Sequence, residues 1–209
     1  MSPIFGAAFL WLVATILWWS GWREEPAGEL PHWTVGVFLS VWPIALFGNI
    51  RLTPAYSVNG AWAWTVLAVL FVALRLPPAS RWKAISAGLL VGAVALLLER
   101  LAFAAYGFVH GFLPWGIALI VGLLAALSFR SLNEQALAIT ASELFAGGTA
   151  ALLASQAGPF SSEWTAQWLC AWWIAVLFAR AWTELAAAFG KLAAKGLLGS
   201  GEKGGEQRS

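Results

Sequence analysis

The sequence predicts an all-α fold, a polytopic bundle of about seven transmembrane helices. Hydrophobic residues make up 60% of the 209 residues and only 11% are charged, whereas soluble domains carry roughly 25% charged residues. Apolar stretches near the bilayer-crossing length of about 20 residues recur along the chain. When these stretches are read as crossings, ten of the twelve Lys and Arg residues fall on one side. These observations predict an integral membrane protein with one helical domain.

Seven segments fit the crossing helices: residues 4–22, 33–50, 60–76, 84–108, 113–129, 132–154 and 164–183. The second contains Pro43, which should kink the helix, while a neighbouring helix satisfies the freed carbonyl. The fourth carries Glu99 and Arg100, and the sixth is the least apolar. An alternative with six crossings, in which 132–154 lies at the membrane surface, stays open.

The basic residues set the orientation. Short cytoplasmic loops carry an excess of Lys and Arg, so seven crossings place the N-terminus outside and the C-terminus in the cytoplasm, whereas six would export the basic tail. Tryptophans near the segment ends, including Trp33 and Trp82 on the inner side and Trp168 on the outer side, predict interfacial belts. The basic residues on the shared face are Arg23, Arg75, Arg81, Lys83, Arg130, Arg180, Lys191, Lys195, Lys203 and Arg208.

Three regions follow along the chain. Residues 1–184 form the transmembrane domain. In 185–198, Leu185, Phe189 and Leu192 recur at helical spacing, which predicts a cytoplasmic amphipathic helix at the membrane interface. Residues 199–209 are polar and rich in glycine, and this composition predicts disorder.

Glu143 is the strongest candidate for a substrate or ion site. Counted from residue 132 at 1.5 Å per residue, it lies about 16 Å into the membrane, where an ionisable group is costly and often functional. Thr140 shares its helix face and offers a second oxygen ligand. A structural interpretation stays open, in which Glu143 is hydrogen-bonded and strengthens helix packing.

Small residues predict close helix packing. Gly88 and Gly92 form a small-xxx-small surface on segment four, and Gly147 with Gly148 gives segment six a point of helix motion. Glu99 and Arg100 lie farther along segment four, in its outer third. We expect either substrate contacts or a buried ion pair that fixes helix register at these two residues.

Motifs for catalysis and cofactors are incomplete. The sequence has no HExxH pair, no Asp, one cysteine and two histidines on opposite predicted faces. We therefore expect no metal site and no cofactor, and a binding protein in preference to an enzyme. The net charge of +2 also makes nucleic acid an unexpected partner.

The N-terminal helix runs from Phe9-Leu10-Trp11 to Trp22-Arg23, and a late helix contains Ser142-Glu143-Leu144-Phe145. In this order of features the chain resembles the YphA-type small membrane proteins of Firmicutes, whose function is uncharacterised. The resemblance implies a multi-pass membrane protein and supplies no catalytic residues.

These observations lead to an expected function. We expect a bacterial inner-membrane protein without enzymatic activity, which binds a lipid, a membrane-protein partner or a second copy of itself. The first alternative is a small transporter, or its substrate-binding subunit, that uses Glu143 with Thr140, Glu99 and Arg100. The second is a lipid-modifying enzyme that uses Glu99 and His110 at the outer interface.

Overall fold

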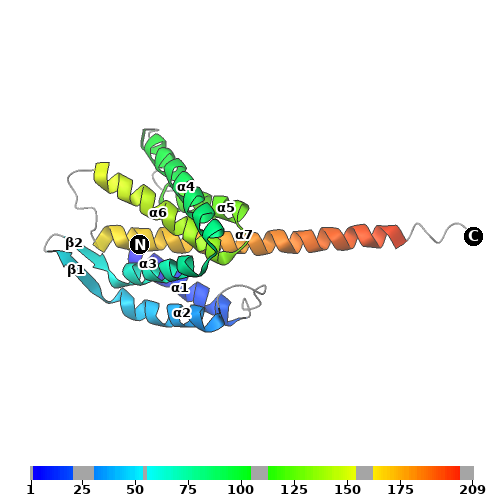
Figure 1. Ribbon diagram of the computed structural model, residues 1–209, viewed down its shortest axis with the longest axis horizontal. Helices are drawn as coiled ribbons and strands as arrows, with labels where there is room; N and C mark the ends of the chain where they lie inside the picture. The colour runs from blue at the N-terminus through cyan, green and yellow to red at the C-terminus, as the bar shows by residue number, and fades with distance from the viewer. Residues whose placement is uncertain (1, 21–30, 54–55, 105–112, 154–161, 203–209) are drawn as a thin grey trace, which may run out of the picture.

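A computed structural model of the chain describes residues 2–20, 31–53, 56–104, 113–153 and 162–202 (Figure 1). The described residues are mainly helical, so the predicted all-α class is confirmed. One helix lies near each of the seven predicted segments. The helices are α1 (Pro3–Trp19), α2 (His32–Leu46), α3 (Gly60–Arg75), α4 (Pro78–Ala104), α5 (Leu113–Ser128), α6 (Leu132–Leu153) and α7 (Ser162–Glu202).

A β-hairpin that the sequence analysis did not predict connects α2 to α3. Its strands are β1 (Asn49–Thr53) and β2 (Tyr56–Asn59), which pair antiparallel with Asn49 opposite Asn59. Asn59 then caps α3, because its side chain accepts a hydrogen bond from the Ala61 amide at 2.8 Å. The same side chain donates to the Leu46 carbonyl at 3.0 Å, so it joins the end of α2 to the start of α3.

Pro43 lies inside α2, as the sequence predicts. A helical proline has no amide hydrogen, so the carbonyl four residues earlier, that of Leu39, loses its partner. The Trp11 indole of α1 donates a hydrogen bond to this carbonyl at 2.9 Å. The expectation that a neighbouring helix satisfies the freed carbonyl is therefore confirmed.

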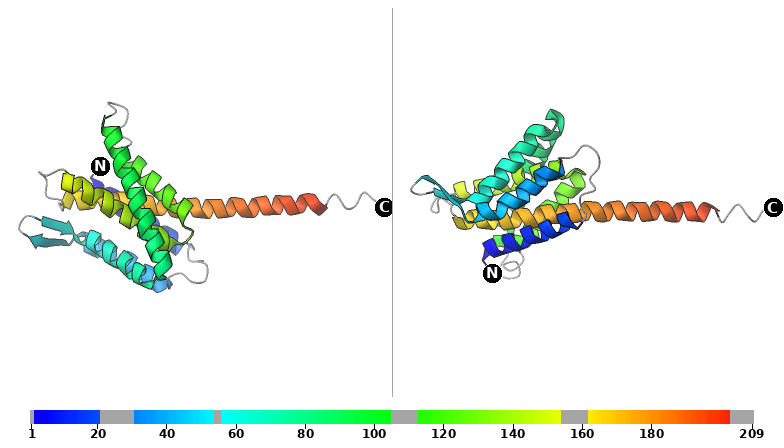
Figure 2. Two further views of the ribbon diagram at one scale, coloured as in Figure 1. Left: turned by 45° about the horizontal axis from the view of Figure 1, so that its top comes forward. Right: turned by 90° about the horizontal axis from the view of Figure 1, so that it is seen from below.

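Successive helices run in alternating directions between two ends of the bundle (Figures 1 and 2). The turns from α3 to α4 and from α5 to α6 lie at the end where α7 leaves the bundle, and we call this the basic end. The hairpin lies at the opposite end. The turns and first helical residues at the basic end carry Arg81, Lys83 and Arg130, and α3 ends there at Arg75.

Helix length supports only part of the predicted membrane topology. Among the described residues, two helical stretches are long and apolar enough to cross a membrane, Pro78–Leu101 and Glu163–Lys191. Helices α1, α2, α3 and α5 contain 15 to 17 residues, about 22–26 Å at 1.5 Å per residue. They are one to three residues shorter than the predicted segments; α2 differs most and ends at Leu46 before the hairpin.

Helix α7 is one continuous helix of 41 residues, about 60 Å long, and about half of it projects beyond the bundle (Figure 1). Residues 185–198, which we expected as an interfacial helix, continue α7 without a break. Residues 199–202 are also helical, although their composition predicts disorder, because extending a helix costs less than starting one. Residues 203–209 lie outside the described part of the chain.

Tryptophans occupy the core as well as the surface. Trp33, Trp82 and Trp115 are exposed, as interfacial belts require. Trp168 is only 4% exposed, so its assignment to the outer belt is wrong. It lies on α7, which the other helices surround over its first half (Figure 2), and a position near the end of this helix is therefore still inside the protein.

Large apolar side chains cover the outer surfaces of several helices. On α1, Phe5, Phe9, Leu12 and Ile16 are all exposed and recur at intervals of three or four residues, so they form one outward stripe. Exposed leucines follow the outer faces of α3 and α4 in the same way. Contiguous apolar surface of this kind marks contact with a membrane or a partner protein.

Candidate functional site

Thr140 already makes two hydrogen bonds in this structure. It is buried in α6, where its hydroxyl donates a hydrogen bond to the Ala136 carbonyl at 2.7 Å. The same oxygen accepts a hydrogen bond from the Trp172 indole of α7 at 2.8 Å. The first bond lies within α6 and the second joins α6 to α7, so a cation bound through Thr140 would share this oxygen with a buried interhelical contact.

Glu143 lies on α6 with its side chain partly exposed, and Glu99 of α4 lies within electrostatic range of it. Glu99 and Arg100 are themselves exposed on α4. The structure thus brings two of the predicted site residues, Glu99 and Glu143, near one another. Thr140 has a different environment, against α7.

The glycines predicted for helix packing differ in their surroundings. Gly88 lies directly against the Ala138 carbonyl of α6, and a Cβ atom at Gly92 would lie 2.7 Å from the Ser142 carbonyl oxygen. Gly147 faces the Trp164 indole of α7, whereas a Cβ atom at Gly148 would meet nothing within 4 Å. Helices α4 and α6 therefore approach closely through Gly88 and Gly92.

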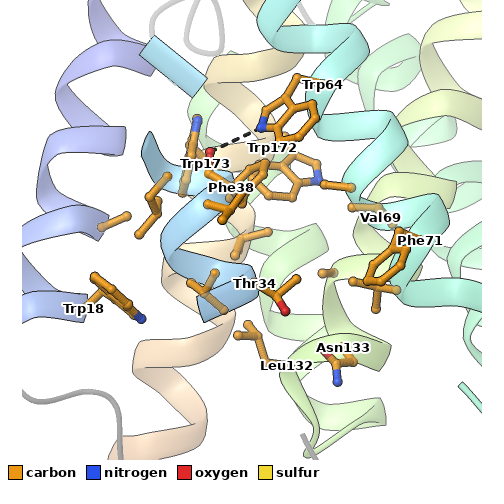
Figure 3. A pocket seen from close by; sticks show the side chains of 18 of the residues that line it. Trp18, Thr34, Phe38, Trp64, Val69, Phe71, Leu132, Asn133, Trp172 and Trp173 are labelled. Atoms are coloured by element: carbon orange, nitrogen blue, oxygen red, sulfur yellow. Dashed lines mark hydrogen bonds between the residues drawn. The ribbon is translucent and has the colours of Figure 1, made fainter. Parts of the chain in front are cut away.

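An apolar cavity of about 450 Å³ lies between α2, α3 and α7. Residues of α1 and α6 complete its walls. This volume lies within the range of roughly 300–1,000 Å³ that small-molecule sites occupy. Figure 3 shows Phe38, Trp64, Trp172 and Trp173 grouped at one end of the cavity. The polar residues Thr34 and Asn133 lie at the other end, together with Trp18 and Leu132.

Two hydrogen bonds join α2 to α3, and the first involves residues that line the aromatic end. The Trp64 indole donates to the Phe38 carbonyl at 3.2 Å, and the Trp42 indole donates to the Thr65 hydroxyl at 3.2 Å. Trp172 and Trp173 of α7 meet edge to face there, with their ring centroids 5.1 Å apart. Side chains held in this way give the cavity a rigid aromatic wall.

The polar end of the cavity lies toward the basic end of the bundle. Thr34 of α2, Asn133 of α6 and Arg180 of α7 line it. Arg180 is only 9% exposed, and its Nη2 atom lies 2.9 Å from the Glu184 carboxylate one turn farther along α7. The cavity therefore joins a long apolar surface to one buried cation and two neutral polar groups.

The cavity opens sideways, between the outer surfaces of α2 and α3. Four of its lining residues, Trp33, Val37, Leu67 and Phe71, are also exposed. Because these residues belong to the two helices that diverge toward the basic end (Figure 3), they border the opening. An apolar chain outside the protein could pass between them without crossing a polar surface.

Sequence reasoning missed this cavity. Its walls come from five helices, and lining residues such as Phe38 and Trp172 lie more than 100 positions apart in the sequence. Two sequence signals were present. Arg180 interrupts an apolar stretch, and the neighbouring residues Trp172 and Trp173 lie in the middle of a predicted helix instead of at its end. Both features indicate side chains with an internal partner or ligand.

Among the described residues, no group of three or more His, Cys and acidic side chains lies close enough together to hold a metal ion. His110, on which the enzyme alternative depends, lies outside the described part of the chain. Comparison of the chain with family models, curated proteins and solved structures gives no match. The resemblance to YphA-type proteins therefore stays a prediction.

Proposed function

We propose that this protein is an integral membrane protein that binds a membrane lipid, with one apolar chain of the lipid in the cavity between α2, α3 and α7. The observation that carries the proposal is the cavity itself, which is apolar, opens sideways and ends in polar groups. A lipid has the same division into a long apolar part and a polar end. Burial of the chain against Phe38, Trp172 and Trp173 would supply the affinity.

All seven helices cross the membrane in this proposal, with the basic end in the cytoplasm and the hairpin end outside. The alternating helix directions and the apolar outer faces support it. Helices of 15 to 17 residues can serve as spans where the bilayer thins locally or flanking residues reach toward the interface. For a bacterial protein, the bilayer would be the inner membrane.

Binding explains the cavity better than transport or catalysis. The transport alternative depends on Glu143, and Thr140 is already bonded to Trp172, which leaves the proximity of Glu99 as its support. The residues described as lining the cavity include no acid, histidine, cysteine or lysine. Thr34 therefore has no general base beside it within the cavity wall.

A cavity-filling substitution tests the proposal. Ala68 of α3 lines the cavity, and Leu70, two residues farther along the same helix, faces outward. We expect Ala68→Phe to occupy the space and reduce the lipid that co-purifies with the full-length protein about tenfold, measured by mass spectrometry of extracted lipids. Leu70→Phe introduces the same ring on the outer face and should retain the wild-type amount.

Thermal unfolding of both variants in detergent checks that each is folded. If folded Ala68→Phe protein retains as much lipid as Leu70→Phe and the wild type, lipid does not occupy this cavity and the proposed function is wrong.

A further inference from the structure

We propose that the cavity selects lipids with an acidic headgroup, a carboxylate or a phosphate, and that Arg180 binds this group in place of Glu184. The inference rests on the proposed function and adds the chemical class of the ligand. Arg180 is the cation among the lining residues, so it is the group that distinguishes acidic from neutral lipids.

Arg180 lies at the depth where a headgroup would lie. It follows Trp172 by eight residues on α7, about 12 Å along the helix axis, so the aromatic end and the guanidinium bound the cavity lengthwise. Trp19 and Trp182, near the same end of the bundle, are exposed, as expected for rings at the level of lipid headgroups. A chain inserted to the aromatic end would therefore leave its acid group beside Arg180.

Glu184 occupies the anion position in the present structure. Its carboxylate lies 2.9 Å from the Arg180 Nη2 atom, yet its side chain is 48% exposed, whereas that of Arg180 is 10% exposed. An ion pair between residues i and i+4 with one exposed partner is weak. The Glu184 side chain can turn into water, and the acid group of the lipid would then take the place of its carboxylate beside the guanidinium.

The chemistry of the surrounding groups fits an acid. A guanidinium presents five donors in a planar fork, which matches the oxygens of a carboxylate or a phosphate. Asn133 and Thr34, on the facing helices, line the same end and can donate further hydrogen bonds to such oxygens. A neutral headgroup would gain less, because it offers the guanidinium no charged oxygen and so no charge-assisted hydrogen bond.

Brominated single-chain amphiphiles test the inference, because bromine in the chain quenches tryptophan fluorescence when the chain lies beside Trp172 and Trp173. The probes are dibromostearate, dibromostearyl phosphate and the neutral dibromostearyl alcohol, each titrated into the full-length protein in detergent at a pH where the acids are ionised. We expect the wild type to bind at least one of the acids about tenfold more tightly than the alcohol.

Three variants separate the contributions. Arg180→Gln should remove the preference for acids while the affinity for the alcohol stays unchanged. Glu184→Gln should strengthen acid binding several-fold, because the competing carboxylate is gone, and it leaves Arg180 in place. Arg130→Gln, which removes an exposed cation near the same end, should change neither affinity. Inorganic phosphate in excess should not displace the acidic probes if the chain is required for binding.

The outcomes are distinguishable. Equal binding of acids and alcohol in the wild type, abolished for both by Ala68→Phe, would overturn the headgroup inference and leave the proposed function standing. An acid preference that survives Arg180→Gln, or that Glu184→Gln leaves no stronger than in the wild type, would also overturn it. Displacement by inorganic phosphate alone would assign Arg180 to a free anion instead of a lipid. Quenching of the wild type by none of the three probes would overturn the proposed function together with the inference.

Discussion

Pro43 shows how a single residue determines a contact between two helices. Its missing amide leaves the Leu39 carbonyl without a donor inside α2, and the Trp11 indole supplies one from α1 at 2.9 Å. Trp11 also stacks on Trp42, with ring centroids 6.0 Å apart and planes 9° apart. The proline and the tryptophan are therefore coupled through one carbonyl oxygen.

A double-mutant cycle tests this coupling. We expect Trp11→Phe, which keeps a ring on Trp42 but leaves the Leu39 carbonyl unsatisfied, to lower the free energy of unfolding by about 1–3 kcal/mol. In a Pro43→Ala background the new amide satisfies that carbonyl, so the cost of Trp11→Phe should be clearly smaller. Equilibrium unfolding in detergent measures both costs, and equal costs in the two backgrounds would show that the hydrogen bond does not couple the residues.

The sequence predicted that the Leu39 carbonyl would need a hydrogen-bond donor, but it did not predict that Trp11 would supply it. A proline in a helix identifies the unsatisfied carbonyl by counting back four residues, and that reasoning is local. The donor lies 28 residues away, and only the packing of α1 against α2 selects it. The same limit applied to Thr140, whose helix face was predictable while its bond to Trp172 was not.

At the scale of elements, glycine decides how closely α4 and α6 approach. A Cβ atom at Gly92 would lie 2.7 Å from a backbone oxygen of Ser142, which cannot move without its helix. We expect Gly92→Ala to lower stability by about 1–3 kcal/mol through overpacking. Gly148→Ala is the matched control, because a methyl group there meets open space and should be neutral or stabilising by up to about 1 kcal/mol.

Thermal or denaturant unfolding of the two variants in the same detergent measures this difference. Equal effects at Gly92 and Gly148 would mean that helix propensity, and not the contact between α4 and α6, decides the outcome.

The positions of the helices followed from apolar runs, but their ends did not. Segment 84–108 begins six residues earlier, at Pro78, where a proline suits the first turn of a helix. Segment 33–50 ends four residues earlier, because β1 begins at Asn49. The alternation of Ile50 and Leu52 with polar neighbours was a strand signal, but its short length and position within an apolar run concealed it.

At the scale of the whole molecule, the cavity is a property of five helices together. The sequence of each helix shows only that it has an apolar face. The pattern does not distinguish a face that packs against another helix from one that borders a cavity. The uneven distribution of Lys and Arg between the two ends of the bundle differs from the cavity in this respect. The position of each Lys and Arg relative to the apolar runs can be read from the sequence. The sequence therefore predicts an orientation, whereas it does not predict the cavity.

That orientation gives a prediction for the complete bundle. With seven crossings and the basic end inside, a reporter attached after Ser209 stays in the cytoplasm. We expect alkaline phosphatase fused there to be inactive and a green fluorescent protein fused there to fluoresce. Phosphatase fused after Asn59, at the hairpin end, should be active, because that point follows two crossings from an external N-terminus.

The fusion after Asn59 is also the control for the number of spans. If α6 lay at the membrane surface, the hairpin fusion would keep its activity while the fusion after Ser209 became active, since six crossings return the chain to the outer side. If only Pro78–Leu101 and Glu163–Lys191 crossed the membrane, both fusions would lie on the same side as the N-terminus. Inactive phosphatase at Ser209 together with active phosphatase at Asn59 therefore requires an odd number of crossings after the hairpin, which the bundle satisfies with α3 to α7.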